Sequence, residues 1–179
     1  MDTRLLAPPA RFRSALPGLA LLLAMLAAPA WASIDVRFIE GAPKDRFEIT
    51  HRGACTLSDV RLVIDLAPSA AGLIFDTTAT GAGVDVFQPF ELVEGADALT
   101  SHTPVNDGDR QVELSVKRLA PGTRIAFTVD VDDTLGQRGI TIAGSEIQGA
   151  AVRVLASGFT SAGRFSAQGD AQAATPPCR

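Results

Sequence analysis

Apolar and polar residues alternate through most of the chain after residue 33. Ile34, Val36 and Phe38 are separated by charged residues, and a period of two is typical of a half-buried strand. The alternation predicts about nine short strands, separated by clusters of Gly, Pro and Asp. They fall at 34–38, 46–50, 60–66, 84–92, 112–117, 125–131, 139–143, 145–155 and 158–165, with a further short apolar run at 73–75.

The segment 145–155 also admits a helix. Ser145 and Gln148 imitate a capping box, and Ile147, Ala151 and Leu155 are four residues apart. We favour a strand, because Gly149 interrupts the segment and valines flank Arg153 in alternation. Residues 166–179 are rich in Ala, Gln, Gly and Pro, which predicts a flexible tail.

Many short strands without a convincing amphipathic helix predict an all-β protein, namely an antiparallel, immunoglobulin-like β-sandwich at residues 33–165. The turns at 106–109 and 121–122 are the clearest hairpin signals, and Pro89 indicates an edge strand or a bulge. We expect six phenylalanines to belong to the core: Phe38, Phe47, Phe75, Phe87, Phe127 and Phe165.

The first 32 residues have the organisation of an export signal. Three arginines precede an apolar stretch of about ten residues at 19–28, and Ala30-Trp31-Ala32 forms a small-x-small cleavage site before Ser33. An uncleaved membrane anchor is the alternative, but a spanning helix needs about 20 apolar residues, and prolines interrupt this run. We therefore predict a secreted or periplasmic protein with no transmembrane segment in the mature chain.

Cleavage would change the composition of the protein. It would remove three of the 16 basic and one of the 20 acidic residues, leaving a formal charge of about −6. Such a charge disfavours nucleic acid and anionic lipid as partners. The only tryptophan, Trp31, would be lost and the chain has no tyrosine, which argues against stacking platforms for sugars or bases.

Several segments together resemble the core, ring-forming domain of sponge aggregation factors and its bacterial relatives. The resemblance covers about 34–156. It implies a non-catalytic extracellular module for cell adhesion or matrix assembly, with a protein or cell-surface partner and possible self-association. The segments that carry it are 34–36, 38–47, 72–76, 81–89, 127–134 and 144–147.

Adhesion by the sponge proteins relies on attached glycans and calcium, and this chain departs from that pattern. Asn106 is the only asparagine and is not in an acceptor sequence for an N-linked sugar. A glycan-mediated role therefore does not carry over, whereas a role in protein or calcium binding does.

Asp130, Asp132 and Asp133 form the candidate metal site. The period of two places Asp130 and Asp132 on one face of a strand, and Asp133 follows where the strand ends. With Asp35, Glu40 or Asp45 from another loop, these carboxylates could supply the oxygen ligands of calcium. The alternative is a solvated acidic strand end, since the chain has no EF-hand loop.

Catalytic interpretations have less support. His51 and His102, the only histidines, lie in no recognisable nucleophile or zinc motif, so we predict a surface or structural role for each and assign no catalytic residue. The alternative function is a secreted ligand-binding or hydrolytic enzyme domain, for which a deep pocket lined by two close carboxylates would be the signature.

Cys55 and Cys178 are the only cysteines. In an exported chain, an intramolecular disulfide between them is the default expectation. Because Cys178 is next to the last residue, the alternative is a bond to another molecule.

Overall fold

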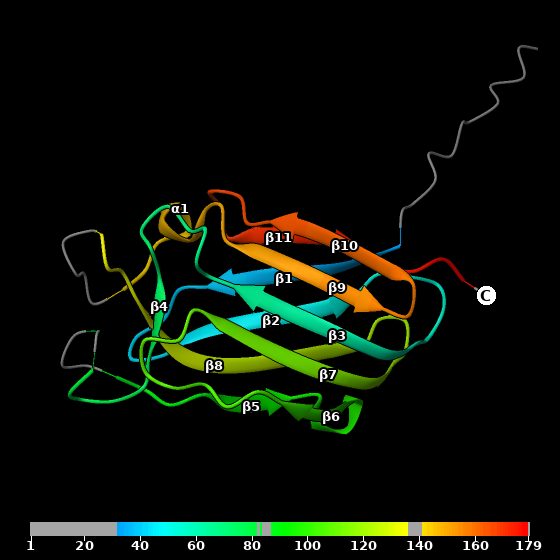
Figure 1. Cartoon of the computed structure of the whole chain (residues 1–179), viewed down its shortest axis with the longest axis horizontal. Helices are drawn as coiled ribbons and strands as arrows, with labels where there is room; N and C mark the ends of the chain where they lie inside the picture. The colour runs from blue at the N-terminus through cyan, green and yellow to red at the C-terminus, as the bar shows by residue number, and fades with distance from the viewer. Residues whose placement is uncertain (1–31, 82, 84–86, 136–140, 179) are drawn as a thin grey trace, which may run out of the picture.

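The computed structural model describes residues 32–81, 83, 87–135 and 141–178, and these form two antiparallel sheets with eleven strands (Figure 1). The predicted all-β sandwich is confirmed, with more strands than predicted. The elements are β1 (Ser33–Ile39), β2 (Asp45–His51), β3 (Leu57–Asp65), β4 (Ile74–Asp76), β5 (Glu91–Glu94), the 3₁₀ turn η1 (Ala96–Ala98), β6 (Leu99–His102), β7 (Gln111–Leu119), β8 (Arg124–Asp132), α1 (Gly144–Ile147), β9 (Ala151–Ala156), β10 (Phe159–Arg164) and β11 (Asp170–Ala174).

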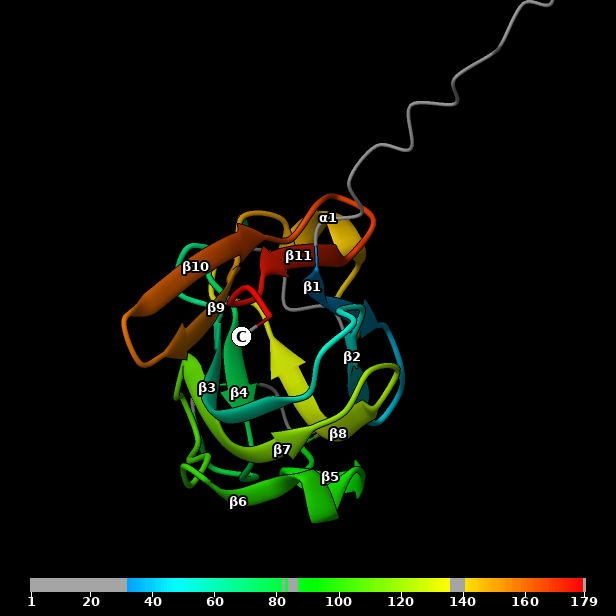
Figure 2. The ribbon, with the colours of Figure 1, turned by 90° about the vertical axis from the view of Figure 1, so that its right-hand side faces the viewer.

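The first sheet has the order β11-β1-β2-β8-β4, and β5 also pairs with β8; the second has the order β10-β9-β3-β7-β6. Figure 2 shows the two sheets facing one another across the core. The strand β4 and the helix α1 lie at one end of the sandwich, and the C-terminus lies at the other (Figure 1).

The core follows from the alternation of the long strands. Along β8, Ile125, Phe127, Val129 and Val131 are all at most 1% exposed, because every second side chain of a strand points to the same face. The Phe47 and Phe127 rings stack with centroids 4.9 Å apart. Of the phenylalanines predicted to belong to the core, Phe87 is only half-buried, and the other five are buried.

The prediction of a flexible tail at 166–179 is wrong. Residues Asp170–Ala174 form β11, which pairs with β1 from Ser33↔Ala174 to Arg37↔Asp170. Ala171 and Ala173 of this strand are buried. The domain therefore extends well beyond residue 165.

Three other boundaries differ from the prediction. The segment 145–155 begins within the single helical turn α1 and continues as β9, and only half of a capping box is present, with Ala143 N donating to Glu146 Oε2 at 2.7 Å. Residues 141–143 are not in a strand, while 139–140 and 84–86 lie outside the described residues. The short strand β6 was not predicted.

Residues 1–31 of the predicted signal also lie outside the described residues. Within the described ranges, no helix has the length and apolar character needed to cross a membrane.

Candidate functional site

The end of β8 and the strand β4 place three aspartates on one face of the first sheet. Asp76 lies opposite Asp130 in the β4–β8 ladder, and Ile74 lies opposite Asp132. Directly paired residues of an antiparallel ladder share a face, as do residues two apart along a strand. The side chains of Asp76, Asp130 and Asp132 therefore project on the same side, away from Phe75 and Val131.

Asp45 joins these aspartates at the beginning of β2. Its Oδ2 accepts a hydrogen bond from Val131 N at 3.2 Å, and its Oδ1 accepts one from Gly41 N at 3.1 Å. The register of β2 with β8 ends at Asp45↔Val129. The Asp45 carboxylate therefore accepts a hydrogen bond from a backbone N–H of β8 that lies just beyond the paired residues.

Asp107 approaches from the turn between β6 and β7. Its Oδ1 accepts hydrogen bonds from Thr77 N at 3.1 Å and Thr78 N at 3.3 Å. The turn is fixed to β4, because Gly108 N donates to the carbonyl of Phe75 at 2.9 Å. We use the name aspartate cluster for five residues: Asp45, Asp76, Asp107, Asp130 and Asp132.

Gly83 covers the carboxylates of Asp76 and Asp132. A methyl group added to Gly83 would overlap both Asp76 Oδ2 and Asp132 Oδ2. The two oxygens therefore lie against the same side of Gly83. Only a residue without a side chain fits there unless its neighbours move.

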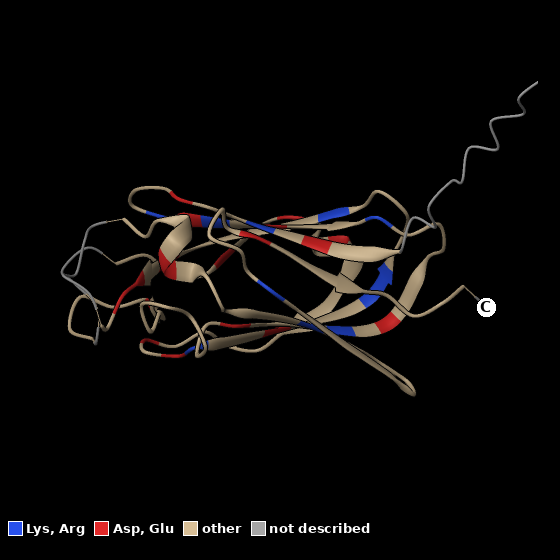
Figure 3. Ribbon diagram, turned by 90° about the horizontal axis from the view of Figure 1, so that it is seen from above, with Lys and Arg blue, Asp and Glu red and all other residues tan. Residues whose placement is uncertain are grey.

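The aspartate cluster is almost completely removed from solvent. Asp76 is 0% exposed, Asp45 1%, Asp132 2% and Asp130 4%, whereas Asp107 is half-buried. In Figure 3 several red segments lie at the end of the sandwich that holds α1, and others lie along the strands. Burying several carboxylates together is costly unless protons or a cation compensate for their charge.

Burial raises the pKa of three of these carboxyl groups. It raises the pKa of Asp45 to about 8, although the N–H groups of Gly41 and Val131 favour the charged form. Burial, followed by the neighbouring carboxyl groups of Asp107 and Asp132, raises the pKa of Asp76 to about 7.

Burial, followed by the charge of Asp132, likewise raises the pKa of Asp130 to about 7. No Lys or Arg of the described residues forms an ion pair with Asp45, Asp76 or Asp130. At neutral pH these groups are therefore poised between protonated and charged forms.

The predicted metal ligands are only partly brought together. Asp130 and Asp132 share a face as predicted, and Asp133 is 2% exposed. The alternative of a solvated acidic strand end is wrong, because Asp130, Asp132 and Asp133 are all at most 4% exposed. Of the further residues proposed from the sequence, Asp45 joins the cluster and Glu40 adds negative charge beside it.

The sequence did not predict that Asp76 belongs to this site. Asp76 ends the three-residue strand β4, and the sequence does not reveal that β4 pairs with β8. Within the described ranges, no three Asp, Glu, His or Cys side chains are already grouped as a metal site.

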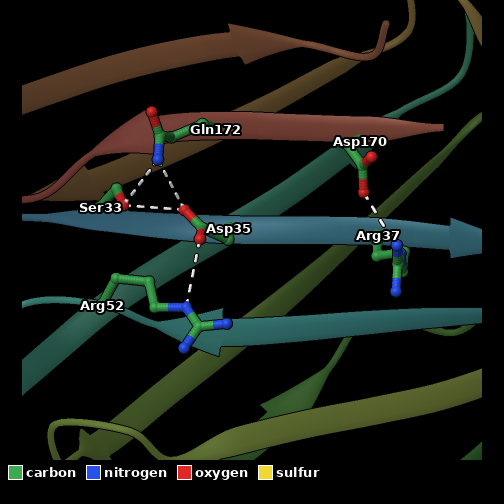
Figure 4. Close-up of polar contacts among 6 residues, drawn as sticks. All are labelled: Ser33, Asp35, Arg37, Arg52, Asp170 and Gln172. Carbon is green, nitrogen blue, oxygen red and sulfur yellow. Dashed lines mark hydrogen bonds and ion pairs between the residues drawn. The ribbon is translucent and has the colours of Figure 1, made fainter. Parts of the chain in front are cut away.

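Asp35, another suggested ligand, lies on the outer face of the first sheet. Its Oδ1 accepts hydrogen bonds from Ser33 Oγ at 2.8 Å and Gln172 Nε2 at 2.9 Å, and its Oδ2 forms an ion pair with Arg52 at 3.3 Å (Figure 4). Arg37 pairs with Asp170 on the same face at 3.4 Å. Asp35 is therefore part of a surface network.

This network lines an open groove of about 770 Å³. Four arginines contribute to it, and three of them already form ion pairs with acidic residues of the same groove. The groove lies on charged strand faces, and its lining does not include the aspartate cluster.

The two histidines occupy different environments. His51 is 1% exposed, with Nδ1 3.3 Å from the carbonyl of Ala120. His102 ends β6, and its ring lies against that of Phe90 with centroids 4.5 Å apart and the planes tilted by 36°. Neither histidine is in a described group that could hold a metal.

Cys55 and Cys178 form a disulfide within the chain, across a sequence separation of 123 residues. The expected intramolecular pairing is present, and it fixes the segment after β11 to the loop between β2 and β3.

No protein-family model, curated protein or solved structure matches this chain. The resemblance to the sponge aggregation factor domain and the immunoglobulin-like variety of the sandwich therefore stay predictions.

Proposed function

We propose that this chain is an exported, non-catalytic β-sandwich module for cell adhesion, matrix assembly or surface protein interaction, with calcium as a structural ion. Its partner would be a protein, a cell surface or further copies of the same chain. The sequence resemblance to the ring-forming domain of sponge aggregation factors motivates this proposal, and the burial of the aspartate cluster is the observation that carries it.

Burial of the cluster supports a structural rather than a catalytic use of its carboxylates. A hydrolytic site needs two carboxylates that a substrate can reach, whereas Asp76, Asp130 and Asp132 are at most 4% exposed. Closely spaced carboxylates without access to a substrate favour a role in holding an ion.

The disulfide supports an exported location. Bonds of this kind persist in oxidising compartments and are rare in the cytosol. Fixing the C-terminal segment to the body of the domain suits a module that works outside the cell. Together with the predicted signal, the Cys55–Cys178 bond is consistent with a secreted or periplasmic protein.

Light scattering on the protein purified from its exported fraction tests the assembly role. We expect particles larger than one chain, with a size that increases when millimolar calcium replaces a chelator. Cross-linking on intact host cells provides the second arm, because an adhesion module should give a defined surface adduct. A strictly monomeric protein without a surface adduct, with or without calcium, would contradict the proposal.

A further inference from the structure

Asp76 is a buried carboxylate without a hydrogen-bond partner. It is 0% exposed, and neither of its side-chain oxygens accepts a hydrogen bond from the described residues, although the Asp107 carboxyl group and the Thr78 N–H lie near enough to affect its pKa. Buried polar groups in folded proteins are nearly always hydrogen-bonded, and each exception requires an explanation. A ligand that binds carboxylate oxygens is one such explanation.

The unpartnered side chain faces a second carboxylate. Asp76 Oδ2 and Asp132 Oδ2 both lie against Gly83, so close that a methyl group added there would overlap both oxygens. The backbone of β4 and β8 fixes both aspartates through the Ile74↔Asp132 and Asp76↔Asp130 register. Two carboxylates on a rigid ladder therefore converge on one point.

We propose that Asp76 and Asp132 bind one calcium ion beneath Gly83. This site differs from the triad of Asp130, Asp132 and Asp133 predicted from the sequence. It rests on the proposed function in one respect, the choice of calcium, which is abundant outside cells. The remaining ligands are backbone carbonyl oxygens and water, which complete most calcium sites.

The donor set selects a hard cation. Carboxylate oxygens suit calcium and magnesium, whereas zinc and copper prefer imidazole and thiolate ligands. Among the described residues, no His or Cys belongs to a group that could hold a metal ion. Calcium accepts irregular geometry and gives up water readily, while magnesium requires a near-ideal octahedron. A site between a short strand and a covering glycine therefore favours calcium.

The ion would connect parts of the chain that are far apart in sequence. Asp76 belongs to β4 and Asp132 to β8, and the carboxylate of Asp107 lies close enough to influence the pKa of Asp76. Calcium would offset the repulsion among these groups and hold β4, β8 and the 105–109 turn together. The acidic end of the sandwich would become more rigid when the ion binds.

Calorimetric titration of the exported protein, first treated with a chelator, tests the site. We expect one calcium ion per chain, much weaker binding of magnesium, and a higher melting temperature with calcium. Asp76→Asn should lower calcium affinity by about a hundredfold, since loss of even an outer partner of a metal ligand costs about 10- to 100-fold. Asp97→Asn is the matched control, because Asp97 is exposed in η1.

Gly83→Ala gives an independent test that keeps every carboxylate. The added methyl group would overlap both oxygens and force the two carboxylates to move, so calcium affinity should fall by at least about tenfold. Melting curves in chelator keep the result interpretable. Without calcium, Asp76→Asn should be at least as stable as the unmodified protein, because it removes a buried charge.

Each outcome decides the question. Absence of calcium binding by the unmodified protein overturns the site, and so does binding that survives both Asp76→Asn and Gly83→Ala. Loss of binding in Asp133→Asn alone would overturn it in favour of the sequence-based triad. Light scattering in chelator separates this result from the proposed function, since self-association without calcium would leave the assembly role standing.

Discussion

Buried carboxyl groups make the free energy of unfolding depend on pH. The pKa values of Asp45, Asp76 and Asp130 are about 8, 7 and 7 in the folded protein, against 3.8 for an ordinary aspartate. The folded state therefore binds more protons than the unfolded state between these values. The protonated carboxyl groups therefore contribute fully to the free energy of unfolding below about pH 4. This contribution is lost as the pH rises through the pKa values of the folded protein.

We predict that the melting temperature in chelator falls steadily between about pH 5 and pH 8. Each unit of pKa difference corresponds to about 1.4 kcal/mol, so the loss is on the order of several kcal/mol. Circular dichroism melts across this range measure it. In Asp45→Asn the fall should be smaller, because the group with the highest pKa no longer titrates.

A pH-independent melting temperature, or an equal slope in Asp45→Asn, would contradict this account. Calcium should reduce the slope only in proteins that retain Asp76, because the ion stabilises the charged form of its ligands.

From the sequence, we could predict which way these side chains point, but not what surrounds them. Period-two alternation placed Asp130 and Asp132 on one face correctly, because that depends only on the geometry of one strand. Their burial depends on distant parts of the chain, since β4 pairs with the end of β8 and Gly83 lies against the Asp132 carboxylate. Asp76 carried no local signal, since a three-residue strand is too short for a pattern.

The strand β11 shows how an element can exist without a strong local preference. Its sequence, Asp-Ala-Gln-Ala-Ala, contains no β-branched or aromatic residue, and strand propensity therefore does not predict it. Pairing with β1 and burial of Ala171 and Ala173 stabilise it instead. Long strands such as β3, β7 and β8 were predicted because their own side chains alternate.

We predict that Ala173→Lys destabilises the protein by about 3 kcal/mol or more, because it places a charge where no solvent reaches. Ala173 is 0% exposed, whereas its neighbour Ala174 points outward. Ala174→Lys is therefore the matched control and should cost less than about 0.5 kcal/mol. Urea unfolding measures both. Equal effects would show that β11 is not docked in solution.

At the scale of the whole molecule, the disulfide links the segment after β11 to the loop between β2 and β3. Bond formation across 123 residues removes much of the freedom of the unfolded chain, which is worth up to about 5 kcal/mol in the chain-entropy account. The bond lies at the opposite end of the sandwich from β4 (Figure 1).

We predict that reduction with dithiothreitol lowers the melting temperature by on the order of 10 °C, at about 2–4 °C per kcal/mol for a domain of this size. The double variant Cys55→Ser/Cys178→Ser should melt at the same lower temperature and not respond to the reductant. A covalent dimer on a non-reducing gel would instead favour the intermolecular alternative.

The hydrogen bonds at the start of β1 bear on the predicted cleavage between Ala32 and Ser33. Ala32 O accepts Thr175 N at 3.0 Å, Ser33 O accepts Arg52 N at 2.8 Å, and Ser33 is 2% exposed. A protease needs an accessible, extended peptide, so the bond between Ala32 and Ser33 is a poor substrate once β11 has docked. If the signal is removed at that bond, cutting must come before the last strand closes the sheet, and a chain that folds first would keep its leader.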